Sequence, residues 1–167
     1  MSDAHQPTFL VSTDSDPVVI AINGKANYLN CNTFREFIDT MMRKGTKQFV
    51  LNFANCTGMD STFLGIMAGT AIQLGKKAPR GALVITELSK KNFDLIKNLG
   101  LHHLLTIKKI SLAKPEIEKK FSQLEDTKVS DPNEVLKAHE NLTYANTENA
   151  IKFEDVISYL RKQVKDG

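Results

Sequence analysis

The chain contains 167 residues, of which 41% are hydrophobic and 25% charged, and its formal net charge at pH 7 is +3. This composition is ordinary for one soluble domain with a sizeable core, and its lysines are mixed with acids instead of forming the basic block of a nucleic-acid groove. No apolar run approaches the length of a membrane span or a signal-peptide core. We therefore expect a cytoplasmic protein with no nucleic-acid partner and no membrane insertion.

The N-terminal part of the chain begins with two strand patterns and one helix pattern. Apolar runs at residues 8–11 and 18–22 predict strands. Asn23-Gly24 then predicts a turn, within a loop that continues to Leu29. From Asn30 the spacing becomes helical, and a glycine ends the helix. Its apolar face consists of Phe34, Phe37, Ile38, Met41 and Met42, and the terminating glycine is Gly45.

The next stretch is the most informative about function. Residues 49–53 are apolar, β-branched or aromatic, which is typical of a strand buried on both faces in the middle of a sheet. Turn formers follow over residues 55–61, and helical spacing returns over residues 62–77. Three oxygen-bearing side chains therefore stand where a helix needs partners for its unpaired first amides. These residues are Asp60, Ser61 and Thr62.

Two glycines in this helix, Gly65 and Gly69, form a G-x-x-x-G pair, which we interpret as close packing of the helix on the sheet. A further buried strand at residues 82–86, an amphipathic helix closed by Gly100 and an edge strand at residues 104–107 follow. Alternating strands and helices predict an α/β fold with a largely parallel sheet and right-handed crossovers, the opening pair of strands being antiparallel.

Beyond residue 111 only helical patterns remain, so we divide the chain into a domain at residues 1–112 and a helical extension at residues 113–167. Asp131-Pro132-Asn133-Glu134 predicts a helix start with Asp at the N-cap. We expect a linker at residues 127–131 and a break at residues 143–149. The apolar stripes of the extension are Ile117, Phe121 and Leu124; Val135, Leu136, His139 and Leu142; and Phe153, Val156, Ile157, Leu160 and Val164.

Isolated helices of this length are marginal in water, so these stripes must be buried. They can dock on the domain itself, pair with a second copy in a homodimer, or form a small bundle that receives a partner. The regular alternation favours intramolecular docking or homodimerisation over a free tail.

The pattern LNFANCTGMDSTFLG at residues 51–65 resembles the STAS domain family, the anti-sigma factor antagonists and related modules. An Asn23-Gly24 loop before it, and residues 82–85 and 98–101 after it, extend the resemblance over about residues 8–107. The resemblance implies a mixed, largely parallel sheet with helices. It also implies that Ser61, directly after the aspartate, is phosphorylated by a partner serine kinase that doubles as an anti-sigma factor, and that a matching phosphatase acts on it.

Two positions depart from the family pattern. Thr62 is followed by Phe63 where the family usually has glycine, and a bulky ring at the rim would alter the partner surface. Gly24-Lys25-Ala26-Asn27 stands where the family often has an acidic Gly-x-x-Asp, which changes the expected kinase contact.

Ser61 has two interpretations. It can be an N-cap that stabilises the helix by about 1 kcal/mol, or a phosphorylation site, where a phosphate at a helix N-terminus is tolerated by the fold but blocks a partner built to receive a neutral hydroxyl. Thr62 is the second candidate acceptor. The predicted partner surface consists of Thr57, Gly58, Met59, Asp60, Ser61, Thr62, Phe63 and Leu64.

We therefore expect a non-enzymatic regulatory protein-binding module with no cofactor and no metal. Two alternatives stay open: an unphosphorylated scaffold or accessory subunit of a transport system, and a hydrolase. The hydrolase has little sequence support, because no G-x-S-x-G elbow is present and no motif spacing relates His102, His103 or His139 to Ser61. Cys31 and Cys56 lack metal-binding or redox spacing and are expected to be reduced thiols.

Overall fold

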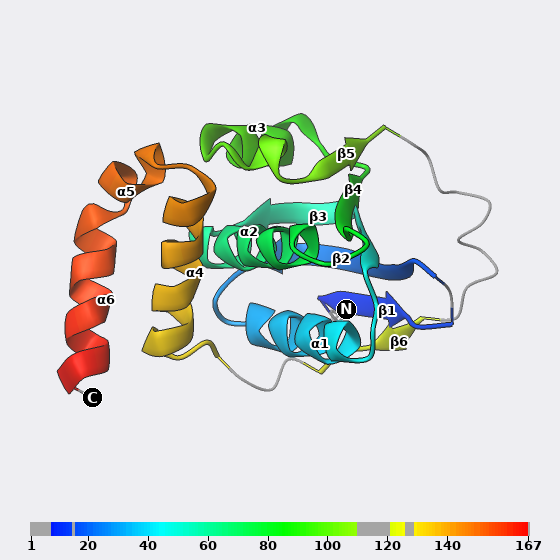
Figure 1. The fold of residues 1–167 in the computed structure, drawn as a ribbon, viewed down its shortest axis with the longest axis horizontal. Coiled ribbons are helices and arrows are strands. Elements are labelled where there is room, and N and C mark those ends of the chain that lie inside the picture. The colour runs from blue at the N-terminus through cyan, green and yellow to red at the C-terminus, as the bar shows by residue number, and fades with distance from the viewer. Residues whose placement is uncertain (1–7, 15, 110–120, 126–128, 167) are drawn as a thin grey trace, which may run out of the picture.

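The structure is a computed structural model, and it describes residues 8–14, 16–109, 121–125 and 129–166. Within these residues a mixed sheet of six strands has the order β5-β4-β3-β2-β1-β6 (Figure 1). β2, β3, β4 and β5 are parallel neighbours, whereas β1 is antiparallel to β2 and β6, as expected for the opening pair. The strands are β1 (Phe9–Ser12), β2 (Val18–Ala26), β3 (Gln48–Met59), β4 (Ala82–Thr86), β5 (Thr106–Lys108) and β6 (Ser122–Gln123).

The helices form two groups. α1 and α2 lie next to each other in front of the sheet in Figure 1, and α3 packs against β3. α4 crosses the first half of α2, and α6 runs back beside α4 in the opposite direction, joined to it by α5 (Figure 1). The helices are α1 (Cys31–Arg43), α2 (Ser61–Gly75), α3 (Lys90–Asn98), α4 (Pro132–Ala145), α5 (Glu148–Lys152) and α6 (Glu154–Asp166), with the 3-10 turn η1 (Leu101–His103) before β5.

Two strands are longer than the sequence pattern predicts. β2 continues through Asn23-Gly24, where a turn was expected, and β3 continues through the turn formers to Met59. The two extensions pair with each other, with shifts of register on either side of Gly24, whose φ is 74°. A glycine that adopts this left-handed conformation lets a strand bulge and continue, so the turn interpretation was wrong.

The sheet takes its last strand from beyond residue 112. Residues 122–123 pair with β1, and the Leu124 amide donates to the Phe9 carbonyl at 3.0 Å. The helix expected around Phe121 and Leu124 is therefore wrong at these residues, because the polar pair Ser122-Gln123 completes a sheet edge instead. The remainder of that expected helix, residues 110–120, lies outside the described residues.

α4 begins as predicted, and the C-terminal helices dock on the domain, one of the arrangements that the sequence left open. Val156 of the expected apolar stripe is, however, 42% exposed. Asp131 and Glu134 form a capping box, each side chain accepting from the other's amide at 2.9 Å. α4 runs to residue 145, so the break is shorter than expected. Ile157 and Leu160 of α6 pack on Leu136 of α4, and α4 packs on α2, which confirms intramolecular docking. No helix in the described ranges is long and apolar enough to cross a bilayer.

Candidate partner-binding site

The junction between β3 and α2 is built around Asp60. Its backbone is extended, with φ −100° and ψ 176°, and it is the N-cap of α2. One carboxylate oxygen accepts from the Phe63 amide at 2.9 Å, and the other accepts from the Tyr28 amide at 2.9 Å. Asp60 thus caps the helix and ties it to the loop after β2. Because both oxygens have structural partners, Asp60 is not arranged as a general base.

Ser61 is the first residue of α2 and is half-buried, and its hydroxyl does not cap the helix. Ser61 Oγ lies 2.8 Å from Nε2 of His139, a residue of α4 that is only 3% exposed. His139 Nδ1 lies 2.7 Å from the Val135 carbonyl. A carbonyl oxygen only accepts, so Nδ1 carries the hydrogen, and in the neutral ring Nε2 accepts from the Ser61 hydroxyl. Sequence spacing gave no reason to join these two residues, which are 78 positions apart.

The two glycines of α2 explain how α4 comes so close. A methyl group on Gly65 would lie 2.1 Å from the carbonyl oxygen of Ala138 in α4, and one on Gly69 would lie 2.3 Å from the Asn141 amide nitrogen. Asn141 also donates to the Gly65 carbonyl at 3.3 Å. The prediction of close packing is therefore correct, but the neighbour was wrong: the glycines face another helix and not the sheet.

The predicted partner surface is only partly exposed. The side chains of Thr62, Phe63 and Leu64 are at most 4% exposed. Phe63 lies in the core with ring centroids 5.1 Å from Phe34 and 6.0 Å from Phe9, so the expectation of a bulky ring at the rim was wrong. Three consecutive helical side chains point to different sides of a helix, so their burial means that the start of α2 is covered on more than one side. Of the predicted set, Thr57 is exposed, and Met59, Asp60 and Ser61 are half-buried.

Two neighbouring residues were missed by the sequence reasoning. Tyr28 and Leu29 are 46% and 50% exposed, and Tyr28 is held beside Asp60 by the bond described above. The Ser130 amide also donates to the Tyr28 carbonyl at 2.8 Å, which brings the start of α4 to the same loop. Exposed apolar side chains next to Ser61 would indicate a binding surface. The sequence alone does not show that Tyr28 and Leu29 lie next to Ser61, because this depends on the folded contact with Asp60.

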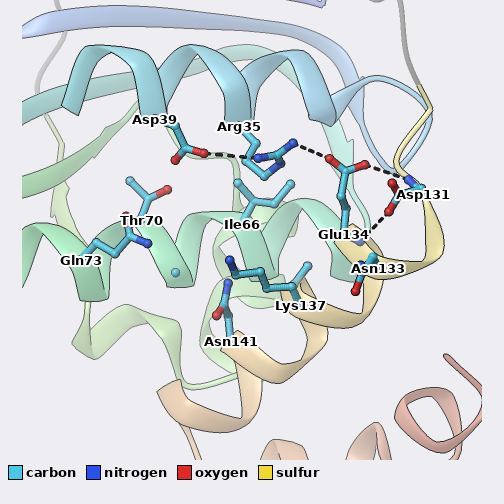
Figure 2. Close-up of a pocket in the computed structure, with 12 residues that line it drawn as sticks. Arg35, Asp39, Ile66, Thr70, Gln73, Asp131, Asn133, Glu134, Lys137 and Asn141 are labelled. Carbon is cyan, nitrogen blue, oxygen red and sulfur yellow. Dashed lines mark hydrogen bonds and ion pairs between the residues drawn. The ribbon is translucent and has the colours of Figure 1, made fainter. Parts of the chain in front are cut away.

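A cavity of about 440 Å³ opens between α1, α2 and α4 (Figure 2). Arg35 on its α1 wall pairs with Asp39 at 3.3 Å and with Glu134 of α4. Lys137 and Asn141 enter from α4, facing Thr70 and Gln73 of α2 (Figure 2). The lining carries both signs of charge, and the carboxylates of Asp39 and Glu134 are both paired with the guanidinium of Arg35.

Other chemistry has weaker support. Within the described ranges no group of three or more His, Cys, Asp or Glu residues could hold a metal ion. Burial raises the pKa of the Cys31 thiol to about 11, and burial also raises the pKa of Cys56, so neither is a ready thiolate. The rings of His102 and His103 in η1 lie with their centroids 3.9 Å apart and are tilted by 39°. Ser61 and His139 line neither the cavity of Figure 2 nor a second one of about 540 Å³ beside α3 and β5.

Comparison with known proteins agrees with this fold. The family model of the STAS domain matches residues 9–125. The solved structure of the anti-sigma factor antagonist SpoIIAA in its unphosphorylated form is 19% identical, with a TM-score of 0.53, over 65% of this chain and 94% of that one. The Bacillus cell fate determinant SpoIIAA in its phosphorylated form is 20% identical, with a TM-score of 0.51, over 66% of this chain and 99% of that one. No curated protein matches the sequence.

Proposed function

This chain belongs to the STAS domain family, and from that premise we propose that it is a non-enzymatic regulatory module switched by phosphorylation of Ser61. Its binding surface comprises Thr57, Asp60 and Ser61 with the neighbouring Tyr28 and Leu29. Its partner is a protein, a serine kinase that is also an anti-sigma factor, and a phosphatase reverses the modification. Such a module works in the cytoplasm, where the kinase has ATP.

The observation that carries this proposal is the hydroxyl of Ser61 at the start of α2. Asp60 performs the capping, so the hydroxyl is not needed to cap the helix, and its one described contact is with His139. A helix N-terminus favours added negative charge, and a phosphate there would leave α2 intact. The motif resemblance of residues 51–65 supports the assignment, because it implies that Ser61 corresponds to the family's phosphorylated serine. SpoIIAA, which this fold resembles, has been solved in both the phosphorylated and the unphosphorylated form. Thr62 is a poor second acceptor because it is 4% exposed.

The proposal is tested by capturing partners from the native cell with the full chain and its Ser61→Asp and Ser61→Ala variants. We expect Ser61→Asp to lose the partner, because an added anion meets a surface matched to a neutral hydroxyl, and Ser61→Ala to retain it. Ser158→Asp, on the exposed face of α6, is the control for added charge. Phosphopeptide mapping should place the modification on Ser61. Equal loss of the partner with both Ser61 variants, or an unmodified Ser61 under all growth conditions, would favour a scaffold role.

One observation favours a second candidate, a hydrolase. Ser61, His139 and the Val135 carbonyl are ordered as nucleophile, base and orienting group. A substrate would have to enter between α2 and α4, where the helices are in contact through Gly65 and Ala138. Ester hydrolysis that disappears in both Ser61→Ala and His139→Ala, with the fold retained, would support the hydrolase. Hydrolysis that persists in both variants would exclude this pair as its source.

A further inference from the structure

The helix α4 lies across the end of α2 that presents Ser61 (Figure 1). The contact is direct, because the Ser61 hydroxyl bonds to His139 at 2.8 Å. We propose that α4 is an intramolecular cover of Ser61 that leaves Thr57, Tyr28 and Leu29 of the partner-binding face exposed, and that a phosphate on Ser61 and the docked α4 exclude each other. Phosphorylation then releases the C-terminal helices. The inference rests on the proposed function in one respect, namely that Ser61 is the modified residue.

The imidazole of His139 cannot easily move aside. Nδ1 is held by the Val135 carbonyl at 2.7 Å, and Phe153 packs against the ring edge-on with centroids 5.2 Å apart. The side chain is 3% exposed. Ser61 Oγ already lies 2.8 Å from Nε2, so a phosphate on an Oγ in this position would bring its phosphorus atom and outer oxygens against the ring. The ring therefore leaves only when α4 leaves.

The charges at the site also oppose a phosphate beneath the docked helix. The carboxylate of Asp60 is fixed beside Ser61 by its two amide bonds. With Nδ1 donating to the Val135 carbonyl, Nε2 of the neutral His139 ring has no hydrogen to donate, so a phosphate beneath the docked helix would gain a hydrogen bond there only if the ring took up a second proton. With α4 docked, a dianion on the half-buried Ser61 would lie against the Asp60 carboxylate and the buried His139 ring, and it would be less hydrated than with α4 removed. With α4 removed, the same phosphate is hydrated and lies at the favourable end of α2.

The cover is attached so that it moves as a unit. Phe153, which touches His139, also packs with Leu136 and Ile157 in the small core between α4 and α6. Displacing the His139 ring would therefore disturb the packing between α4 and α6, and not only one side chain. Opposite Gly65, α4 contacts α2 through its backbone, which cannot yield by rotating a side chain. The docked and released positions are accordingly distinct states with no continuous adjustment between them.

The test uses the full chain with phosphoserine placed at position 61 by amber suppression, and follows amide hydrogen exchange by mass spectrometry. We expect the amides of α4 to exchange about tenfold faster or more than in the unmodified chain, because a released helix loses its tertiary protection. Phosphoserine at position 158, on the exposed face of α6, is the matched control and should leave α4 protected. Unchanged or slower exchange of α4 with phosphoserine at 61 would overturn the inference.

A second arm opens the cover without phosphate. Gly65→Ala should raise the exchange of α4 in the same direction, and phosphoserine at 61 should then add little. A large further increase in this background would mean that the phosphate acts elsewhere and would contradict the inference. The assay contains no kinase and no partner. An unmodified Ser61 in cells would therefore refute the proposed function alone, whereas protected α4 in the phosphorylated chain would refute the cover alone.

Discussion

Gly65→Ala is the substitution that best separates the docking of α4 from the stability of the domain beneath it. The added methyl group would lie 2.1 Å from the Ala138 carbonyl oxygen, 2.5 Å from its carbon and 2.9 Å from its Cα. All three atoms belong to the backbone, so α4 must move outward by roughly 1 Å to restore ordinary contact. Within α2 itself, alanine is a better helix former than glycine by about 1 kcal/mol. The substitution should therefore loosen α4 while stabilising α2.

The expected size follows from what docking buries. Ala138 and Leu142 of α4 are 2% and 0% exposed, and burying one leucine is worth about 1.5–3 kcal/mol. Overpacking at a close contact costs typically about 1–3 kcal/mol. We expect the free energy that holds α4 on α2 to fall by about 1–3 kcal/mol, seen as faster exchange of the α4 amides and easier proteolysis near its ends. Thermal unfolding of the sheet should change little.

Gly75→Ala is the matched control, since it makes the same change in the same helix. Its methyl group would meet only the Arg80 side chain, at 3.7 Å. Gly69→Ala should fall between the two, because the Asn141 side chain at 2.3 Å can rotate away at the expense of its bond to the Gly65 carbonyl. Equal protection of α4 in Gly65→Ala and Gly75→Ala would show that the close contact does not control docking.

Three further substitutions or conditions test separate contacts. His139→Ala leaves a cavity and a serine without its partner, and should lower the free energy of unfolding by about 1–3 kcal/mol in urea titrations. No change would show that the Ser61–His139 hydrogen bond is not formed in solution. Asn149 is fully buried and donates to the Leu99 and Leu142 carbonyls at 2.9 Å each. Asn149→Ala should therefore lower the free energy of unfolding by about 1–3 kcal/mol and speed the hydrogen exchange of the α4 amides. An exchange pattern like that of the natural chain would contradict this. Burial raises the pKa of Cys31 from 9.0 to about 11. Between these pH values the thiol of the unfolded chain is deprotonated while that of the folded chain keeps its proton. The free energy of unfolding should therefore fall by on the order of 2–3 kcal/mol as the pH rises through this range. Cys31→Ala should make that slope shallower, and an unchanged slope would assign it to other groups.

The periodicity of the sequence predicted what depends on local pattern. The helices at Phe34 and Leu136 and the capping box at Asp131 follow from spacing and cap chemistry alone. The pattern failed where pairing overrides propensity. Gly24 lies within a strand because its neighbour β3 offers a ladder to continue along, and Ser122 joins a strand because an edge of β1 is available.

The site shows the same division. Its position at the start of α2 was readable, because the aspartate, the serine and the following helix are adjacent in the sequence. The partner of that serine was not, since His139 is 78 residues away and lies in an apolar stripe that reads as ordinary core. The Gly65–Gly69 pair did carry the necessary information, namely that something approaches α2 closely. Nothing in the sequence alone distinguishes a helix from a sheet as that neighbour.

The division of labour between Asp60 and Ser61 decides what a modification at this junction can change. Had Ser61 been the N-cap, a phosphate or an alanine there would first alter the stability of α2, and the whole domain would register the change. Because the Asp60 carboxylate accepts from the Phe63 amide instead, the stability of the start of α2 does not depend on whether Ser61 is modified. The hydroxyl has its one described contact across the interface, with His139 of α4. A change of charge at Ser61 therefore acts on the contact with α4. The sheet, α1 and α2 should keep their structure.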